Sequence, residues 1–129
     1  MARGLEIRQS HFPGRAPIEA YGDGGFRFAD MSHRGSILCL PSGIYGWEPA
    51  DRAALTEGDF ERLLDEAKSV EVLLVGTGSS LQPLPKSLKT RFRELGISSD
   101  PMSTGAAVRT YNVLLAEDRA VAAALFSVE

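Results

Sequence analysis

The sequence predicts an α/β fold in a single domain, and three observations carry this prediction. Short alternating segments separated by turn residues fill the first part of the chain, up to Trp47. From Thr56 onward the apolar residues follow the spacing of an amphipathic helix. The segment VEVLLVG, at 70–76, is a continuous apolar run, typical of a strand that is covered on both faces. We therefore expect an antiparallel opening followed by β-α-β-α-β alternation.

Length and composition fit one globular domain. The chain has 129 residues, of which 43% are hydrophobic and 24% charged. Its formal net charge of −3 provides no general attraction to nucleic acid, so we expect no nucleic-acid partner. The single cysteine, Cys39, excludes an intramolecular disulfide, and its apolar neighbours predict a buried thiol.

Residues 1–17 are expected to form an extended N-terminal segment before a domain that spans 18–129. This segment carries Arg3, Arg8 and Arg15 but no apolar core, which argues against a secretory signal. No run in the chain approaches the ~18 apolar residues that a membrane span needs. We expect a cytoplasmic protein.

Turn residues and alternation define the antiparallel opening. The segment Gly22-Asp23-Gly24-Gly25 predicts a hairpin turn, and SHRGS at 32–36 is predicted as the next turn. Between them Phe26 and Phe28 alternate with a polar residue, as in a half-buried strand. Strands at 36–41 and 44–47 are then predicted to pair.

Three helices are predicted after the opening. The first begins at Thr56, which resembles the start of a capping box with Asp59, and it continues to Ala67. The second has Pro85 as its first residue and stops at Gly96. The third is capped by Ser103 or Thr104 and covers 105–118. A short parallel strand at 97–100 and a closing strand at 120–128 complete the alternation.

Gly76-Thr77-Gly78 directly follows the apolar strand and resembles part of a phosphate-binding loop. The dinucleotide fingerprint needs a third glycine or alanine at the position of Leu81, and a helix that begins inside the motif. Both are missing here. The sequence therefore favours a tight turn beneath a neighbouring helix. Backbone N–H groups that face a pocket at the carboxyl end of the strand remain an alternative.

The start of the third helix is a second candidate site, because Thr104 and Gly105 belong to a run of small residues there. The free N–H groups and the helix dipole favour an anion, and Arg109 could supply charge. The sequence favours the other interpretation, close helix packing with Arg109 bridging to a carboxylate or to carbonyl groups, because every helix start has these features. Asn112 stands among apolar residues and could bond the backbone of 76–78. The candidate ligand pocket therefore comprises Gly76, Thr77, Gly78, Thr104, Gly105, Arg109 and Asn112.

No catalytic or metal-binding set is recognisable in the sequence. His11 and His33 lie in turn-like polar surroundings without the paired spacing of a metal site. No nucleophile elbow surrounds Ser79 or Ser80. We predict no catalytic residue, metal or cofactor and expect a non-enzymatic protein, although an enzyme built only from Ser, Thr, Arg and Asn stays open.

Three segments resemble a small α/β family named after an archaeal Mth protein: 72–78, the Gly-Ile at 96–97, and 103–125. The family includes uncharacterised bacterial proteins and a mitochondrial assembly factor for respiratory complex I. The resemblance runs from about Ile18 to the C-terminus and is most specific at the Thr-Tyr-Asn of 110–112. It implies a three-layer domain, with a mixed five-stranded central sheet flanked by helices and a small additional antiparallel β layer.

The resemblance also implies a function, namely a non-enzymatic protein-binding factor in complex I assembly. Protein partners and a peripheral location at the inner membrane follow from it, while the oligomeric state stays open. Many relatives carry a cysteine where this chain has Val108, so thiol chemistry at that position cannot operate here. A binding module predicts an exposed patch that includes Tyr45 and Trp47. The alternative is a small-molecule anion-binding protein or weak enzyme that uses the candidate pocket.

Overall fold

The computed structural model describes residues 11–129, so the predictions made for Arg3 and Arg8 lie outside the described residues. The strands are β1 (His11–Pro13), β2 (Ile18–Gly22), β3 (Gly25–Phe28), β4 (Met31–Arg34), β5 (Ser36–Leu40), β6 (Gly43–Trp47), β7 (Val72–Gly76), β8 (Ser98–Met102) and β9 (Val121–Leu125). The helices are α2 (Glu61–Asp65), α3 (Lys86–Glu94) and α4 (Thr104–Ala116), with 3₁₀ turns η1 (Glu57–Phe60) and η2 (Ala67–Ser69).

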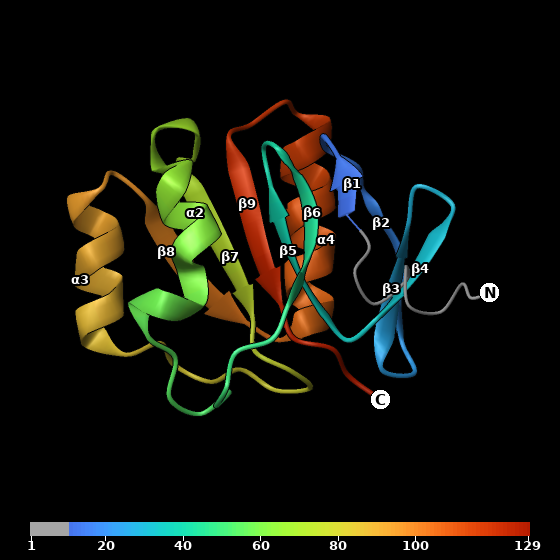
Figure 1. Ribbon diagram of the computed structural model, residues 1–129, viewed down its shortest axis with the longest axis horizontal. Coiled ribbons are helices and arrows are strands. Elements are labelled where there is room, and N and C mark those ends of the chain that lie inside the picture. Colours follow the sequence, from blue (N-terminus) through green and yellow to red (C-terminus); the bar gives the residue numbers. More distant parts are fainter. Residues whose placement is uncertain (1–10) are drawn as a thin grey trace.

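Two β-sheets organise residues 11–129 (Figure 1). The larger is a six-stranded mixed sheet in the order β1-β6-β5-β9-β7-β8. In it β7 runs parallel to both β8 and β9, whereas β5 is antiparallel to β6 and β9. The smaller sheet, β2-β3-β4, is antiparallel. The α/β class, the mixed central sheet and the additional β layer are thus confirmed, and β1 adds a sixth strand by pairing with β6.

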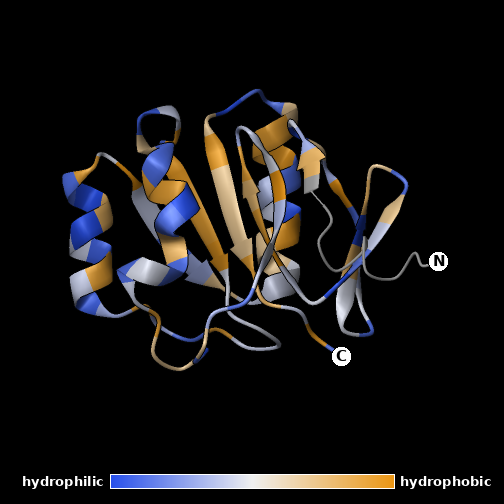
Figure 2. Cartoon of the chain, in the orientation of Figure 1, coloured by the Kyte–Doolittle hydropathy of each residue, from blue (hydrophilic) through white to orange (hydrophobic). Residues whose placement is uncertain are grey.

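Helices cover both faces of the large sheet, which explains the continuous apolar strands. On β7, Leu73 and Val75 belong to the cluster beneath α2 and α3, while Leu74 belongs to the cluster beneath α4. The same alternation divides the side chains of β5 and β9 between the two clusters. Figure 2 shows the resulting hydrophobic character of β7 and β9. A strand that is buried on both faces has no solvent-facing position for a polar side chain, so its apolar run is continuous.

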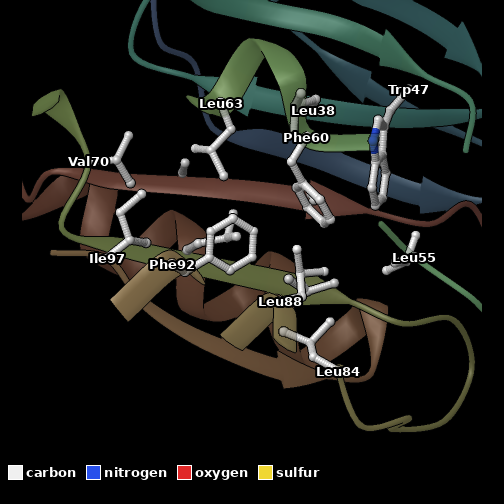
Figure 3. Packing of buried hydrophobic residues seen from close by; sticks show 14 of the residues in the cluster. Leu38, Trp47, Leu55, Phe60, Leu63, Val70, Leu84, Leu88, Phe92 and Ile97 are labelled. Carbon is white, nitrogen blue, oxygen red and sulfur yellow. The ribbon is translucent and has the colours of Figure 1, made fainter. Parts of the chain in front are cut away.

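Aromatic rings pack against one another within the cluster on the α2 and α3 side (Figure 3). Trp47 stacks on Phe126 with ring centroids 4.7 Å apart, and Phe60 meets Phe92 edge to face at 5.2 Å. The expected exposed patch with Trp47 is therefore wrong. Trp47 is 5% exposed and donates its indole N–H to the carbonyl of Asp59 at 2.7 Å. Tyr45 is half-buried beneath the guanidinium of Arg62.

The small sheet packs Phe26 and Phe28 into the cluster on the α4 side. Its first hairpin turn is confirmed, with positive φ at Asp23 and Gly24. The predicted turn at 32–36 is wrong, because Ser32–Arg34 continue β4. The reversal occurs earlier, at Ala29-Asp30, where both residues have positive φ without any glycine to announce the turn.

The histidine prediction is also wrong for His33, which lies in a strand rather than in a polar turn. His33 is 4% exposed and pairs across the strands with Phe26. Since successive strand residues alternate between faces, His33 shares the buried face with that phenylalanine. His11 lies in β1, paired with Tyr45 of β6.

The predicted helix at 56–67 is broken into η1, α2 and η2. Phe60 and Glu66 have φ near −118° and −115°, outside the helical region, and interrupt the helix at these two points. The predicted cap is present, since the amide of Thr56 donates to the Asp59 carboxylate at 2.8 Å. The other two helices are confirmed, with Ser103 as the cap of α4. Pro85 precedes α3 as its cap instead of opening it.

Candidate functional site

The carboxyl ends of β7, β8 and β9 meet at one end of the large sheet. All three strands run parallel, and their arrowheads point to the same end of the molecule in Figure 1. After β7 the chain enters α3 on one face of the sheet, and after β8 it enters α4 on the opposite face. Such a divergence opens a crevice outside the strand ends, where open α/β sheets bind ligands.

Gly76 allows α4 to begin close to the end of β7. A Cβ atom at Gly76 would lie 3.0 Å from the Cα of Thr104 and 3.0 Å from a methyl carbon of Leu125. The helix start could not approach the strand this closely with a side chain at position 76. The first glycine of the Gly76-Thr77-Gly78 segment therefore serves close packing, as the tight-turn interpretation holds.

Thr104 joins three segments through its buried side chain. Its hydroxyl group donates to the carbonyl of Phe126 at 2.8 Å and accepts from the amide of Gly78 at 3.0 Å. Its own amide donates to the carbonyl of Gly78 at 2.8 Å. Thr104 is fully buried, so its polar groups hold the crevice together and are not offered to a ligand.

Thr77 also joins several backbone segments by hydrogen bonds, in the loop that follows β7. Its amide donates to the carbonyl of Met102 at 2.8 Å, and its hydroxyl oxygen accepts from the amide of Gln82 at 2.9 Å. The hydroxyl oxygen also lies within donating distance of the carbonyls of Ser80, at 2.8 Å, and Met102, at 3.1 Å. The loop after β7 is thus fixed by its own hydrogen bonds.

A cleft of about 750 Å³ opens above these contacts. Its walls come from β2, from the start of α4, from the loops that follow β7, β8 and β9, and from the 49–55 region. The lining residues are Tyr21, Arg52, Gly78, Ser79, Ser103, Gly105, Ala106, Arg109, Ser127, Val128 and Glu129. The ring of Tyr21 lies against Gly105, where a Cβ atom would collide with the Tyr21 hydroxyl. Gly105 therefore makes room for an aromatic wall.

Two arginines with different surroundings face this cleft. Arg52 is held in place, because it donates to the carbonyl and the hydroxyl of Ser127 and stacks on Phe126 at 4.5 Å. Arg109 is exposed and makes no ion pair within residues 11–129. The expected bridge from Arg109 to a carboxylate is absent from that part of the chain. Arg109 is thus available to an acidic group, with Glu129 as the acidic residue among the lining.

Asn112 lies away from the cleft, and the expected bond from Asn112 to the 76–78 backbone is wrong. Its amide oxygen accepts from the Ile18 amide at 2.9 Å, and its NH₂ group donates to the Ile18 carbonyl at 2.9 Å. These paired bonds imitate a neighbouring β-strand and tie the edge of β2 to α4. Asn112 lies about one helical turn beyond Arg109, which lines the cleft. Its partner, Ile18, is distant in the sequence, so this contact depends on tertiary packing.

Cys39 and Tyr111 form a buried pair beneath α4. Burial raises the pKa of the Cys39 thiol to about 12, with a smaller opposing effect from its hydrogen bond to Tyr111. Burial likewise raises the pKa of the Tyr111 hydroxyl. Neither group lines the cleft, and Val108 packs in the same cluster. Both groups are protonated at neutral pH, and the buried state expected for Cys39 is confirmed.

Neither metal-binding clusters nor spanning helices occur in the described part of the chain. No three His, Cys, Asp or Glu side chains within residues 11–129 gather in a way that could hold a metal ion. Among the same residues, no helix has the length and apolar character to cross a membrane.

The sequence of this chain matches a known protein family over most of its length. Residues 18–126 match the family described as "protein of unknown function (DUF498/DUF598)", and this chain belongs to that family. The resemblance inferred from the sequence is therefore confirmed.

Three relatives illustrate the range of the family. The chain is 65% identical in sequence to a Bartonella henselae protein whose crystal structure is described as that of an outer membrane protein. The two structures superimpose with a TM-score of 0.87, over 92% of this chain and 99% of that one. It is 41% identical to an uncharacterised Rhodobacter capsulatus protein, over 92% of this chain and 90% of that protein. It is 28% identical to NADH dehydrogenase [ubiquinone] 1 alpha subcomplex assembly factor 3 of Mus musculus. That alignment covers 94% of this chain but 65% of the mouse protein.

Among the seven residues of the predicted pocket, Gly78, Gly105 and Arg109 line the cleft. Tyr21, Arg52 and the segment 127–129 line it as well and were missed. They come from distant parts of the sequence, and no local pattern marks them. The only hint was Gly105, whose missing side chain shows that some group must approach the helix start there.

Proposed function

We propose that this chain is a non-enzymatic protein-binding factor that assists the assembly of respiratory complex I or of a related complex. The observation that carries the proposal is the similarity to the mouse assembly factor, which extends over 94% of this chain. The common part is thus nearly the whole chain, not one motif. The proposal rests on analogy between relatives, and the cleft is the surface at which we propose that the partner binds. The role implies a peripheral location at the inner membrane.

The side chains on the walls of the cleft support this proposal. Tyr21, 42% exposed, and Arg109 stand on its walls, and these two residue types are enriched among residues that dominate binding energy at protein interfaces. Leu81 lies 58% exposed in the loop that follows β7. We assign the cleft to an extended segment of a partner protein whose acidic side chain pairs with Arg109.

Deletion of the gene in the organism that encodes it tests this function. We expect less assembled complex I in membranes separated on native gels, and recovery when the wild-type gene is restored. An Arg109→Ala gene should restore assembly poorly, whereas Lys68→Ala, which removes an exposed charge elsewhere, should restore it fully. Normal complex I levels in the deletion strain would argue against the proposal.

A second candidate function is the binding of a small anion, and one observation favours it. Arg109 has no carboxylate partner among residues 11–129 and faces an open volume of about 750 Å³. A thermal-shift screen of carboxylate and phosphate metabolites tests it. A rise in the melting temperature that is lost in Arg109→Ala supports an anion site, while a flat response leaves the cleft to the protein partner.

A further inference from the structure

A second hollow, which we call the α3–β8 hollow, lies at the edge of the large sheet opposite β1. Its volume is about 360 Å³, and its walls are Lys89 and Arg93 of α3, Gly96, Ile97, and Ser98 and Ser99 of β8. It shares no residue with the cleft described above.

The helix wall presents two positive charges on one side. Leu88 and Phe92 of α3 are buried against the sheet, and Lys89 and Arg93 each follow one of them. Residues four apart are neighbours on a helix surface, so both cations face the hollow together.

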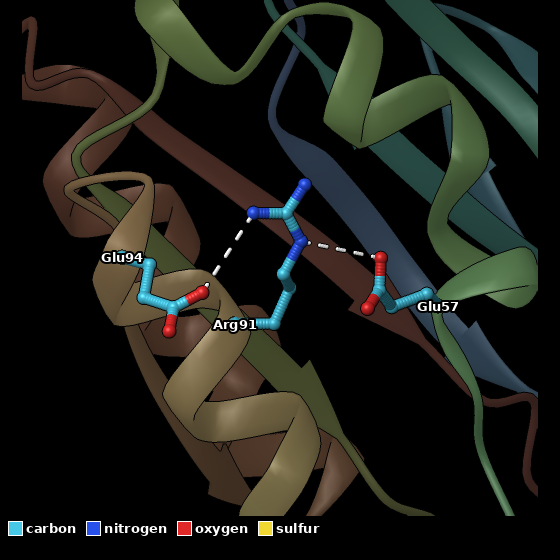
Figure 4. Close-up of polar contacts among 3 residues, drawn as sticks. All are labelled: Glu57, Arg91 and Glu94. Atoms are coloured by element: carbon cyan, nitrogen blue, oxygen red, sulfur yellow. Dashed lines mark hydrogen bonds and ion pairs between the residues drawn. The ribbon is translucent and has the colours of Figure 1, made fainter.

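These cations have no acidic partner in the described structure. The ion pairs found within residues 11–129 join Arg15 to Asp118, and Arg91 to Glu57 and Glu94. Figure 4 shows how Arg91, on the same helix, is held between its two carboxylates. Lys89 and Arg93 take part in none of these pairs, and no lining residue of the hollow is acidic. Two uncompensated cations therefore stand together in a chain whose net charge is −3.

The strand wall adds hydrogen-bond donors. The Ser98 amide donates to Glu71 and the Met102 carbonyl accepts from Thr77, so these two residues direct their backbone groups toward β7. In a parallel ladder the residues between them face the other way, which directs the Ser99 N–H to the open edge. Pro101 has no N–H to expose there, as expected on an edge strand. The hydroxyl group of Ser99 is a further donor, because Ser99 pairs with Leu73 on the α3 side of the sheet.

Asp100, the acidic residue of β8, faces away from α3. It pairs with Leu74, which belongs to the cluster beneath α4, whereas Ser99 pairs with Leu73 on the α3 side. Paired residues of neighbouring strands point to the same face of a sheet. The Asp100 carboxylate is therefore separated from the hollow by the sheet itself.

The end of α3 opposes an anion only weakly. The amides of Gly96 and Ile97 donate to the carbonyls of Arg93 and Phe92, both at 2.9 Å, and so satisfy two of the terminal carbonyl groups. A cation in the last turn often serves to balance the helix dipole, and Arg93 can do so. Lys89 lies more than a turn before the helix end, where that role does not account for it.

We infer that the α3–β8 hollow binds a phosphate group, carried either by a free phosphate ester or by a lipid headgroup. A phosphomonoester carries a charge of about −1.5 to −2 at neutral pH, which the two cations match. Its oxygens accept several hydrogen bonds at once, and the arginine fork, the lysine, and the amide and hydroxyl groups of Ser99 provide them. This site is independent of the proposed protein-binding function.

Titration of the full ¹⁵N-labelled chain with inorganic phosphate tests the site, with chloride used to hold the ionic strength constant. Saturable shifts are expected at the amides of 96–99. In Lys89→Gln/Arg93→Gln the affinity should fall by about tenfold or more, because charge-assisted hydrogen bonds are lost. The control Lys68→Gln/Arg119→Gln removes two exposed charges elsewhere and should change the affinity by less than about twofold.

Sedimentation with vesicles distinguishes the two sources of phosphate. Binding to vesicles that contain phosphatidic acid, but not to pure phosphatidylcholine, identifies a lipid headgroup. Phosphate-dependent shifts without vesicle binding identify a free ester, and either result supports the site. Absence of saturable shifts at 96–99, or equal affinity in the double variant, would overturn it. If the double variant is unstable, Arg93→Gln alone, which changes an exposed side chain, takes its place in the titration.

Discussion

Thr104 is the residue on which the geometry of the cleft depends most directly. Its hydroxyl group satisfies the Gly78 amide and the Phe126 carbonyl in a fully buried position. Thr104→Val removes both bonds and should lower the free energy of unfolding by about 2–4 kcal/mol, because each unsatisfied buried group costs ~1–3 kcal/mol. Urea denaturation measures the change.

Thr104→Ser is the matched control for that experiment. It keeps the hydroxyl group and removes one methyl group, so a loss of about 1 kcal/mol is expected. Equal losses in the valine and serine variants would show that packing, and not hydrogen bonding, stabilises this position.

Cys39 should be inert in the folded protein. It is fully buried and its pKa is raised to about 12, whereas an exposed thiolate is the form that attacks the disulfide of a thiol reagent. We expect no reaction with Ellman's reagent at pH 8 in buffer and reaction of one thiol per chain in 6 M guanidinium. Rapid reaction of the native protein would contradict the buried position.

Single residues show what the sequence could and could not predict about the site. Gly78, Gly105 and Arg109 were predictable because a glycine after a buried strand and a helix start are local features. Tyr21 and Arg52 were not, since they reach the cleft only through tertiary packing. Asn112 was recognised as a polar residue that needs partners, but its partner, Ile18, lies 94 positions away.

At the scale of elements, the bond between α4 and β2 links the small sheet to the rest of the molecule. Asn112→Ala removes two hydrogen bonds to Ile18 and should destabilise the protein by about 1–2 kcal/mol. Amide hydrogen exchange should become faster at Ile18 and along β2, with smaller changes in β7 and β9. Val113→Ala, at a 56% exposed position, should change the stability by less than about 0.5 kcal/mol. Unchanged exchange in β2 would refute the link.

Elements with strong periodicity were predictable, and those set by packing or unusual turns were not. The apolar run of β7 and the start of α4 were located from the sequence. The turn at Ala29-Asp30 was missed because neither residue signals positive φ as glycine does, and β4 was missed with it. The first helix was predicted as continuous, but Phe60 is fully buried and has a φ of −118°, which interrupts it. Tertiary context of this kind overrides helix propensity.

At the scale of the whole molecule, the buried Cys39 predicts a loss of stability at alkaline pH. Its pKa is raised in the folded state from 9.0 to about 12, so the unfolded chain releases the proton first. The contribution of the Cys39 thiol to the free energy of unfolding is fully present below pH 9 and is lost as the pH rises toward 12. The slope approaches about 1.4 kcal/mol per pH unit for one proton. The raised pKa of Tyr111 lowers the stability in the same way at pH values above its ordinary pKa of 10.0.

Comparison with Cys39→Ala isolates this effect. The free energy of unfolding should fall less steeply in the variant than in the wild type between pH 9 and pH 10, by about 1 kcal/mol per pH unit. Identical slopes would show that Cys39 titrates alike in both states.

The central claim is that the chain binds a protein partner through the cleft at the ends of β7, β8 and β9. Affinity capture of the tagged protein from its own cells at native expression, in gentle detergent, tests this claim most directly. Wild type and Lys68→Ala should recover complex I subunits or their assembly partners, and Arg109→Ala should recover several-fold less. Recovery of no specific protein by the wild type, or equal recovery by Arg109→Ala, would contradict the claim.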